Sequence, residues 1–158
     1  SDIPRLAKLG IVASIQPGHA PFGGYFPPTG VGQYLHDHQI AGAYAWQDIR
    51  ETGAKVIFST DWPVIPVDVM TNVKAAVAPQ KLGALWRDQA QTLEDTLESY
   101  TKGNAWAEFR EDRKGQLSVG MMADVAVMSH DLSMVSPDVI NAAAAMITIC
   151  DGKVTFER

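Results

Sequence analysis

The side chain with the clearest chemical potential is Asp61, which follows an apolar run at residues 55–60 and precedes Trp62 and Pro63. Proline has no backbone N–H and restricts the residue before it, so the apolar strand should end here with the carboxylate at its carboxyl-terminal tip. Parallel α/β folds hold ligands and metal ions at that edge of the sheet. An aspartate before an X-Pro pair also closes turns, so spacing alone leaves a functional and a structural role open.

His19 is the second candidate, because it lies just past an apolar strand expected at residues 11–15. If that strand runs parallel to the strand before Asp61, His19 lies on the same face and could bind substrate or polarise a carbonyl group. The alternative is a loop histidine bound to nearby backbone. Gln16 belongs to the same substrate-binding hypothesis. Trp62 is the next candidate, with Phe22, Tyr25 and Phe26, for an apolar wall over a pocket, although aromatic residues also serve as ordinary packing.

Other polar or reactive residues carry weaker signals. His36 and His38 follow a Gly/Pro-rich loop, and two histidines at this spacing can hold a surface metal or simply be solvated. His130 is expected in a polar turn, and Cys150 is expected to pack on an apolar strand. The chain has no Gly-x-Ser-x-Gly elbow, no P-loop and no Gly-x-Gly-x-x-Gly motif, which argues against serine hydrolase chemistry and nucleotide binding.

The elements that must position Asp61 and His19 alternate between helix and strand. A helix is expected from Asp2, its capping residue, to Lys8, with Gly10 as its stop, followed by the strand at 11–15. A second helix is expected from about Ala41 to Thr52, and the second strand occupies 55–60. Its continuous apolar character is typical of a parallel strand covered on both faces, so this part of the chain predicts an α/β fold.

The later part of the chain predicts two more helices and then a change to β structure. Asp68 and Thr92 are expected helix caps, with Asp95 completing a capping box after Thr92. After Gly115 come two β-like runs, 123–128 and 145–150. The second run reaches residues 153–156 through Asp-Gly, a strong hairpin signal. A boundary near Gly115 therefore separates an α/β part from a small β part.

Composition restricts the classes of partner and compartment. The 158 residues are 46% apolar and 20% charged with a formal charge of -5, which indicates an ordinary globular chain with a real core. No cluster of Lys and Arg is present, so neither nucleic acid nor an anionic membrane surface is an expected partner. A single cysteine cannot form an internal disulfide, so we expect a reducing compartment, by default the cytoplasm.

Four motifs in order along the chain resemble amidohydrolase family 3 of the amidohydrolase superfamily. The segment 58–64, FSTDWPV, is similar to the signature on that family's last barrel strand, and 9–17 with His19 is similar to its seventh strand and following loop. Residues 115–127 resemble the strand that returns to the family's β-sandwich, and 150–154 resemble its terminal hairpin. The resemblance implies the C-terminal portion of a (β/α)8 TIM barrel in residues 1–114 and part of a small β-sandwich in 115–158.

The resemblance also implies a metal-dependent hydrolase of C–N bonds in amide, cyclic amide or N-acyl substrates. In such enzymes the aspartate at the position of Asp61 binds a divalent metal, most often zinc, and takes a proton from the attacking water. The family's other metal ligands lie earlier in the barrel than this sequence reaches. We therefore expect a C-terminal fragment, inactive alone and prone to self-association through exposed barrel edges. The alternative is a noncatalytic binding or regulatory protein that retains these fold segments.

Overall fold

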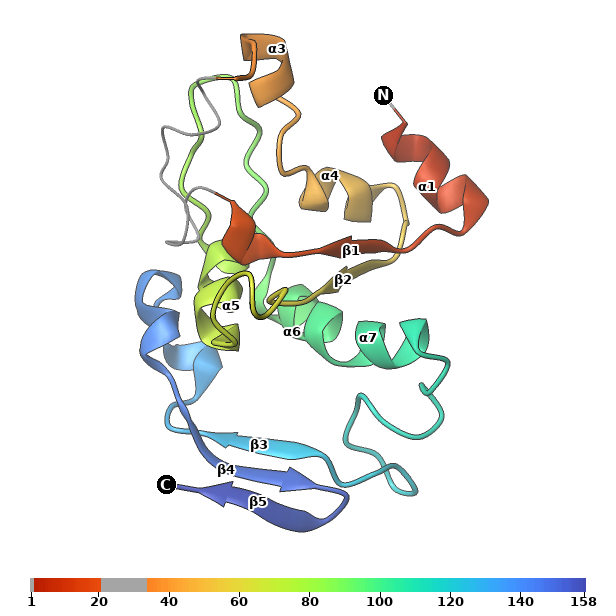
Figure 1. The fold of residues 1–158 in the computed structure, drawn as a ribbon, viewed down its shortest axis with the longest axis vertical. Coiled ribbons are helices and arrows are strands. Elements are labelled where there is room, and N and C mark those ends of the chain that lie inside the picture. The colour runs from red at the N-terminus through yellow and green to blue at the C-terminus, as the bar shows by residue number, and fades with distance from the viewer. Residues whose placement is uncertain (1, 21–33) are drawn as a thin grey trace.

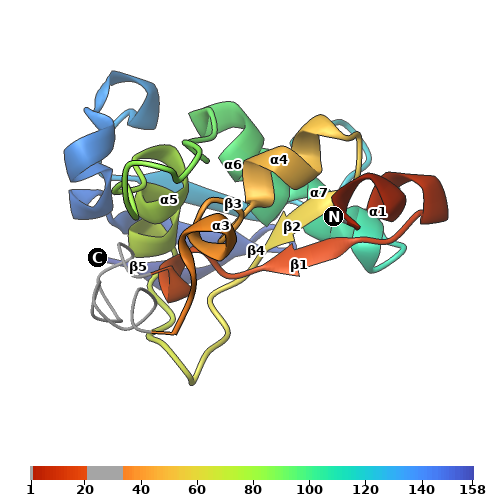
Figure 2. The same ribbon diagram turned by 90° about the horizontal axis from the view of Figure 1, so that it is seen from above.

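The computed structural model describes residues 2–20 and 34–158, and its first part is built around two short parallel strands. Figure 1 shows α4 on one side of the strands and α6 and α7 on the other, while Figure 2 shows β1 and β2 running side by side. In chain order the elements of this part are α1 (Ile3–Leu9), β1 (Ala13–Ile15), η1 (Pro17–His19), α3 (Asp37–Ile40), α4 (Trp46–Glu51), β2 (Val56–Phe58), α5 (Val69–Val77), α6 (Leu93–Tyr100) and α7 (Lys102–Ala107).

The strands β1 and β2 pair in parallel, with Ile15 opposite Phe58 at their carboxyl-terminal ends. Val56 and Phe58 are each only 1% exposed, because helices cover both faces of the pair. The prediction of a parallel strand covered on both faces is confirmed, although both strands are shorter than their apolar runs. This register matters for function because the segments that follow the two strands emerge next to each other.

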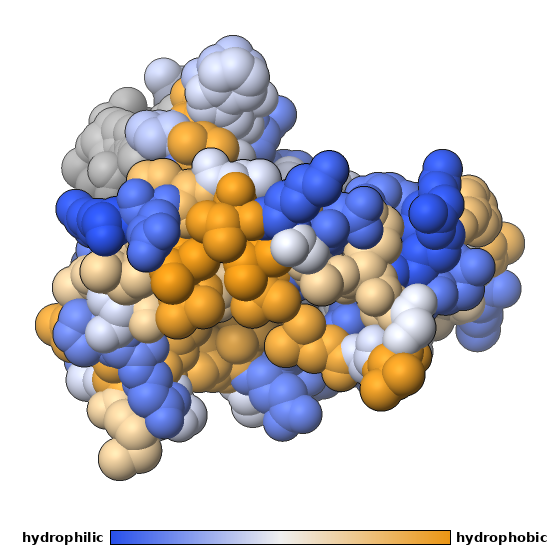
Figure 3. Space-filling model, turned by 90° about the horizontal axis from the view of Figure 1, so that it is seen from below, coloured by the Kyte–Doolittle hydropathy of each residue, from blue (hydrophilic) through white to orange (hydrophobic). Residues whose placement is uncertain are grey.

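The second part of the chain is an antiparallel sheet in the order β3 (Val125–Met128), β4 (Ala145–Cys150), β5 (Lys153–Glu157), with the 3₁₀ turns η3 (Leu132–Met134) and η4 (Pro137–Ala142) between β3 and β4. The predicted Asp151–Gly152 hairpin is confirmed. Both residues have positive φ angles, 48° and 75°, as a type I′ turn requires. Apolar side chains gather on the face of the molecule near this sheet (Figure 3), and its exposed apolar residues include Val127, Val154 and Phe156.

Two predictions about single residues are wrong. Cys150 is exposed, because it ends β4 beside the hairpin, where the sheet has no neighbour to cover it. Asp2 does not cap α1 through its side chain; its backbone is already helical, and its carboxylate binds Arg5 at 2.7 Å instead. The stop at Gly10 is confirmed, since this residue has a φ of 65° and closes the helix.

The caps of the later helices follow the sequence signals closely. The Asp68 side chain accepts the N–H of Met70 at 3.0 Å, and the Thr92 hydroxyl accepts the N–H of Asp95 at 3.0 Å. The expected reciprocal bond from Asp95 is absent from the described contacts of this helix. The carboxylate of Asp95 binds Arg50 of α4 at 2.7 Å instead, so α6 is tied to α4 by an ion pair.

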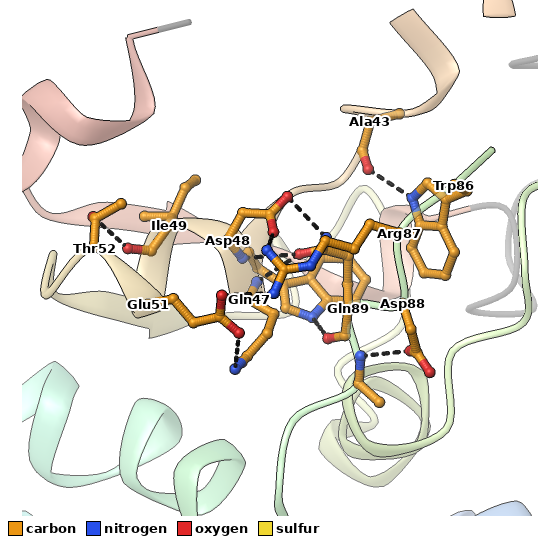
Figure 4. Close-up of polar contacts among 12 residues, drawn as sticks. Ala43, Gln47, Asp48, Ile49, Glu51, Thr52, Trp86, Arg87, Asp88 and Gln89 are labelled. Carbon is orange, nitrogen blue, oxygen red and sulfur yellow. Dashed lines mark hydrogen bonds and ion pairs between the residues drawn. The ribbon is translucent and has the colours of Figure 1, made fainter. Parts of the chain in front are cut away.

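The helix expected over 41–52 is shorter than predicted, because a residue far along the chain sets where it begins. Residues 41–44 form turns after α3, and α4 starts at Trp46. Gln89 accepts the N–H groups of Gln47 and Asp48 through its side-chain oxygen, at 2.8 and 3.1 Å (Figure 4). Its backbone oxygen also accepts the indole N–H of Trp46. Gln89 therefore satisfies the free donors at the start of α4.

The segment around Gln89 is further secured at the surface. Arg87 forms ion pairs with Asp48 and Glu51 of α4, and the Trp86 indole donates to the carbonyl of Ala43 at 2.8 Å. The hydrogen bond from Arg87 is the main cause of the lowered pKa of Glu51. These contacts fasten the connection between α5 and α6 onto α4.

Among the described residues, no helix is long and apolar enough to cross a membrane.

Replacing Gln89 with alanine should lower the free energy of unfolding by about 1–3 kcal/mol, because partly buried N–H groups of α4 lose their acceptor. Urea unfolding followed by tryptophan fluorescence measures this difference. The matched control is Gln116→Ala, at an exposed position, which should change stability by less than about 0.5 kcal/mol. Equal effects of the two substitutions would contradict the capping role of Gln89.

Candidate functional site

The carboxyl-terminal ends of β1 and β2 bring the two principal candidates together. His19 ends the short 3₁₀ turn after β1, and Asp61 lies three residues beyond β2. The His19 Nε2 and Asp61 Oδ2 atoms are 3.4 Å apart, although 41 residues separate them in sequence. The imidazole side chain is 29% exposed and the carboxylate 48% exposed, while the His19 Nε2 atom itself is buried.

Asp61 has an unusual backbone conformation, with a φ of 59° in the left-handed region. Aspartate and asparagine tolerate this region better than other side chains that have a Cβ. A turn closes around the residue, because the N–H of Val64 donates to the carbonyl of Asp61 at 2.8 Å. The following Trp62–Pro63 peptide is cis. The turn reading and the functional reading of Asp61 are therefore compatible, since the turn presents the carboxylate toward His19.

Gln16 and Trp62 lie beside the pair but differ in how they are held. The Gln16 amide donates to the Ser59 hydroxyl at 3.1 Å, so it links the ends of the two strands. Trp62 is 68% exposed and can contact a ligand only from the rim. The expected aromatic partners Phe22, Tyr25 and Phe26 lie outside the described residues, as does most of the Gly/Pro-rich loop.

The other histidines are not part of this arrangement. The rings of His36 and His38 stack with centroids 5.8 Å apart at the start of α3, a helix the sequence did not predict. His130 Nδ1 lies 2.8 Å from the Ser129 hydroxyl in the turn after β3, which agrees with the structural reading. Neither group joins three metal-binding side chains, because the described parts of the chain contain no cluster of three His, Cys, Asp or Glu residues.

Two asparagines that sequence reasoning missed hold the strand ends. Asn72 of α5 is completely buried and accepts the N–H of Gly18 at 2.8 Å. Asn104 of α7 donates to the carbonyl oxygens of Phe58 and Tyr100, at 3.0 and 3.1 Å. The available signal for Asn72 was its place beside Val73 on a helix face that is otherwise apolar, since a buried amide needs hydrogen-bond partners.

The fit to a metal can be tested against the donors that are present. Asp61 offers carboxylate oxygens and His19 offers a ring nitrogen, and both are ordinary ligands of zinc. A catalytic zinc site normally takes three protein ligands, and no third candidate joins these two within residues 2–20 and 34–158. The pair therefore fits part of a metal site, and a complete site requires at least one more ligand.

A cavity of about 1280 Å³ lies apart from this pair, between the helices and the second sheet. Tyr100 lines it, and burial first, then the charge of Asp68, raise the pKa of the Tyr100 hydroxyl. Neither His19 nor Asp61 is among its lining residues, so it is distinct from the candidate site. Its apolar lining includes Met70, Val73, Leu97, Met128 and Leu132.

Comparison with known proteins gives one family and related folds. The model of the amidohydrolase family matches residues 1–156. The putative amidohydrolase YtcJ of Bacillus subtilis is 24% identical over 161 residues, which cover 99% of this chain and 30% of that protein. An uncharacterized metal-dependent hydrolase from Pyrococcus horikoshii has a TM-score of 0.64 and 29% identity, over 77% of this chain and 25% of its own.

A third relative shares the fold at lower identity. The structure of an adenosine deaminase from Xanthomonas campestris with bound zinc has a TM-score of 0.63 and 18% identity, covering 99% of this chain and 34% of that one. The chain thus spans about a third or less of the length of these proteins. Because the family model covers nearly every residue, the chain belongs to the amidohydrolase family.

Proposed function

We propose that this chain supplies part of the active site of a metal-dependent amidohydrolase that cleaves C–N bonds in amide, cyclic amide or N-acyl substrates. The observation that carries the proposal is the approach of His19 to Asp61, 3.4 Å apart at the carboxyl-terminal ends of two parallel strands. That edge is where α/β folds place their ligands. Membership of the amidohydrolase family supports the reaction class.

In this proposal Asp61 is the metal ligand and the general base. A divalent metal held there, zinc being the first candidate, would supply Lewis acidity that makes water acidic enough to lose a proton near neutral pH. The Asp61 carboxylate would accept a proton from the attacking water and return it to the leaving nitrogen, and its partial exposure leaves room for water and substrate. Its position on a tight turn, closed by the Val64 N–H, holds its carboxylate 3.4 Å from His19.

The neighbouring residues act on the substrate. His19 is within reach of the same reacting centre as Asp61 and can donate a hydrogen bond to a substrate carbonyl. Gln16 can contribute its amide oxygen, because its nitrogen is engaged with Ser59. Trp62 supplies an exposed apolar surface at the rim. We assign residues 1–114 to the last strands and helices of a (β/α)8 barrel and residues 115–158 to part of a β-sandwich.

The noncatalytic alternative is compatible with the absence of a three-ligand cluster from the described residues, an absence that catalysis also allows if the other ligands lie outside them. A binding or regulatory protein would keep the strand ends and their turns without completing a metal site. The two functions differ in what the remaining length of the protein contributes. Catalysis requires further histidine or carboxylate ligands there, whereas a binding protein does not.

The purified 158-residue chain should retain much less than one equivalent of zinc after dialysis, because two ligands do not complete the site. Elemental mass spectrometry measures the bound metal. A His36→Ala/His38→Ala variant is the control for adventitious binding at the stacked histidines. Near-stoichiometric zinc that persists in this control and disappears in Asp61→Asn would show instead that the chain builds its own site.

In the longer polypeptide that contains this chain, Asp61→Asn should reduce kcat by about 10³-fold, as expected for loss of a general base. The fold should survive, since asparagine also tolerates the left-handed backbone of this position. Steady-state hydrolysis of a panel of N-acyl compounds and cyclic amides measures the loss. Asp112→Asn, at an exposed position with no described partner, is the matched control. Full activity of Asp61→Asn would refute the assignment.

The chain studied alone should associate with itself through β1 and β2. In the described residues these strands pair only with each other, which leaves an open edge on each. Light scattering should therefore give a mass above the 17.1 kDa of one chain. The control variant Val154→Lys alters the exposed face of the second sheet and should leave this association unchanged. A monomer at high concentration, or a monomeric Val154→Lys, would contradict association through β1 and β2.

A further inference from the structure

We infer that Asn72 is a positioning residue for the candidate site, because it fixes the turn that directs His19 toward Asp61. This inference rests on the proposed function, in which these two residues act together. Asn72 touches neither of them through any described hydrogen bond. Its contact is with Gly18, the residue immediately before His19.

The turn that carries His19 has only local hydrogen bonds within its own backbone. η1 is only three residues long, and its internal backbone bonds are His19 N–H to Gln16 and Ala20 N–H to Pro17, at 3.0 and 3.1 Å. Neither bond ties the turn to another element. The N–H of Gly18 points out of the turn and donates to the Asn72 side-chain oxygen at 2.8 Å, 54 residues away in sequence. This bond connects the turn to α5.

Two hydrogen bonds fix the orientation of the Asn72 side-chain amide. Its nitrogen donates to the backbone carbonyl of Asp68, one turn earlier in α5, at 3.1 Å. With the nitrogen engaged, the oxygen must face Gly18, so the donor and the acceptor of this amide each have one defined partner. Asn72 is 0% exposed, so water cannot replace either contact.

The backbone of the turn is also in close steric contact with its neighbours at Gly18. A Cβ atom added to Gly18 would lie 2.6 Å from both the Asn72 side-chain oxygen and the Ile65 Cδ1 atom. The backbone of the turn therefore rests directly against these two side chains. Ile65 is buried and belongs to the segment that also carries Asp61. The turn with His19 is thus packed against both α5 and the loop that carries Asp61.

The consequence for the site is geometric. A separation of 3.4 Å leaves little room for displacement, because a shift of about 1 Å at a catalytic group can cost about 10²-fold in rate. Loss of the Asn72 oxygen leaves the Gly18 N–H buried without an acceptor, and the turn must move to reach water. His19 moves with it, whereas Asp61 remains on its own turn.

The test is nuclear magnetic resonance on the labelled chain, which reads the position of His19 directly and needs no activity. Cross-peaks between the His19 ring protons and the Asp61 β protons report the contact. Asn72→Leu keeps the branched shape of the side chain but removes the acceptor. We expect these cross-peaks to disappear in Asn72→Leu while the amide signals of β2 and the second sheet stay in place.

Asn104→Leu is the matched control, because Asn104 also anchors a strand end by hydrogen bonds but does not touch the turn. It should keep the His19–Asp61 cross-peaks. If Asn72→Leu fails to fold, Gly18→Ala tests the same contact from the other side by pushing the turn off Asn72. Gly42→Ala, where an added Cβ has only one neighbour at 4.0 Å, is its control.

The outcomes separate the two proposals. Cross-peaks that persist in Asn72→Leu or in Gly18→Ala would overturn the positioning role and leave the proposed function intact. Absence of the cross-peaks from the unaltered chain would remove the observation on which both proposals depend. Their loss in the Asn72 or Gly18 variant, with retention in the Asn104 and Gly42 controls, is the expected result.

Discussion

The arrangement of the site depends on the parallel register of β1 and β2. Pairing Ile15 with Phe58 makes both strands end at one edge, so the turn after β1 and the loop after β2 must emerge side by side. Parallel strands cannot be joined by a tight turn, and the chain between them has to cross back over the sheet. During this return α4 packs on both strands.

Three side-chain amides bind backbone groups where regular backbone pairing stops. Gln89 closes the start of α4, Asn72 binds the turn after β1, and Asn104 binds the last residue of β2. Each reaches a backbone group more than 40 residues away. A buried amide of this kind contributes modestly when satisfied, but its loss leaves another polar group unpaired, so it defines one backbone position strongly. The short strands need such contacts because each contributes only three residues to its ladder.

The parts of this structure that the sequence predicts are those with local causes. The stop at Gly10, the caps at Asp68 and Thr92, and the Asp-Gly hairpin each depend on residues within a few positions, and all are present. The start of α4 could not be predicted, because Gln89 decides it from 42 residues away. The prediction that Cys150 is packed was wrong for a related reason. Apolar character places a residue on a strand but does not say whether anything covers that strand.

The same distinction explains why Asp61 could be identified as a candidate from the sequence and Asn72 could not. Pro63, shortly after the apolar run at 55–60, marks the end of β2 by local chemistry, and the Asp61 carboxylate between them is a candidate for chemistry from its type alone. An asparagine on an apolar helix face signals only that some polar group must meet it, without naming the group. The proposed site therefore combines reactive side chains, whose positions follow from strand ends, with buried amides, whose contacts can be identified only from the three-dimensional structure. A substitution at an amide such as Asn72 can displace the site without altering any residue that touches a ligand.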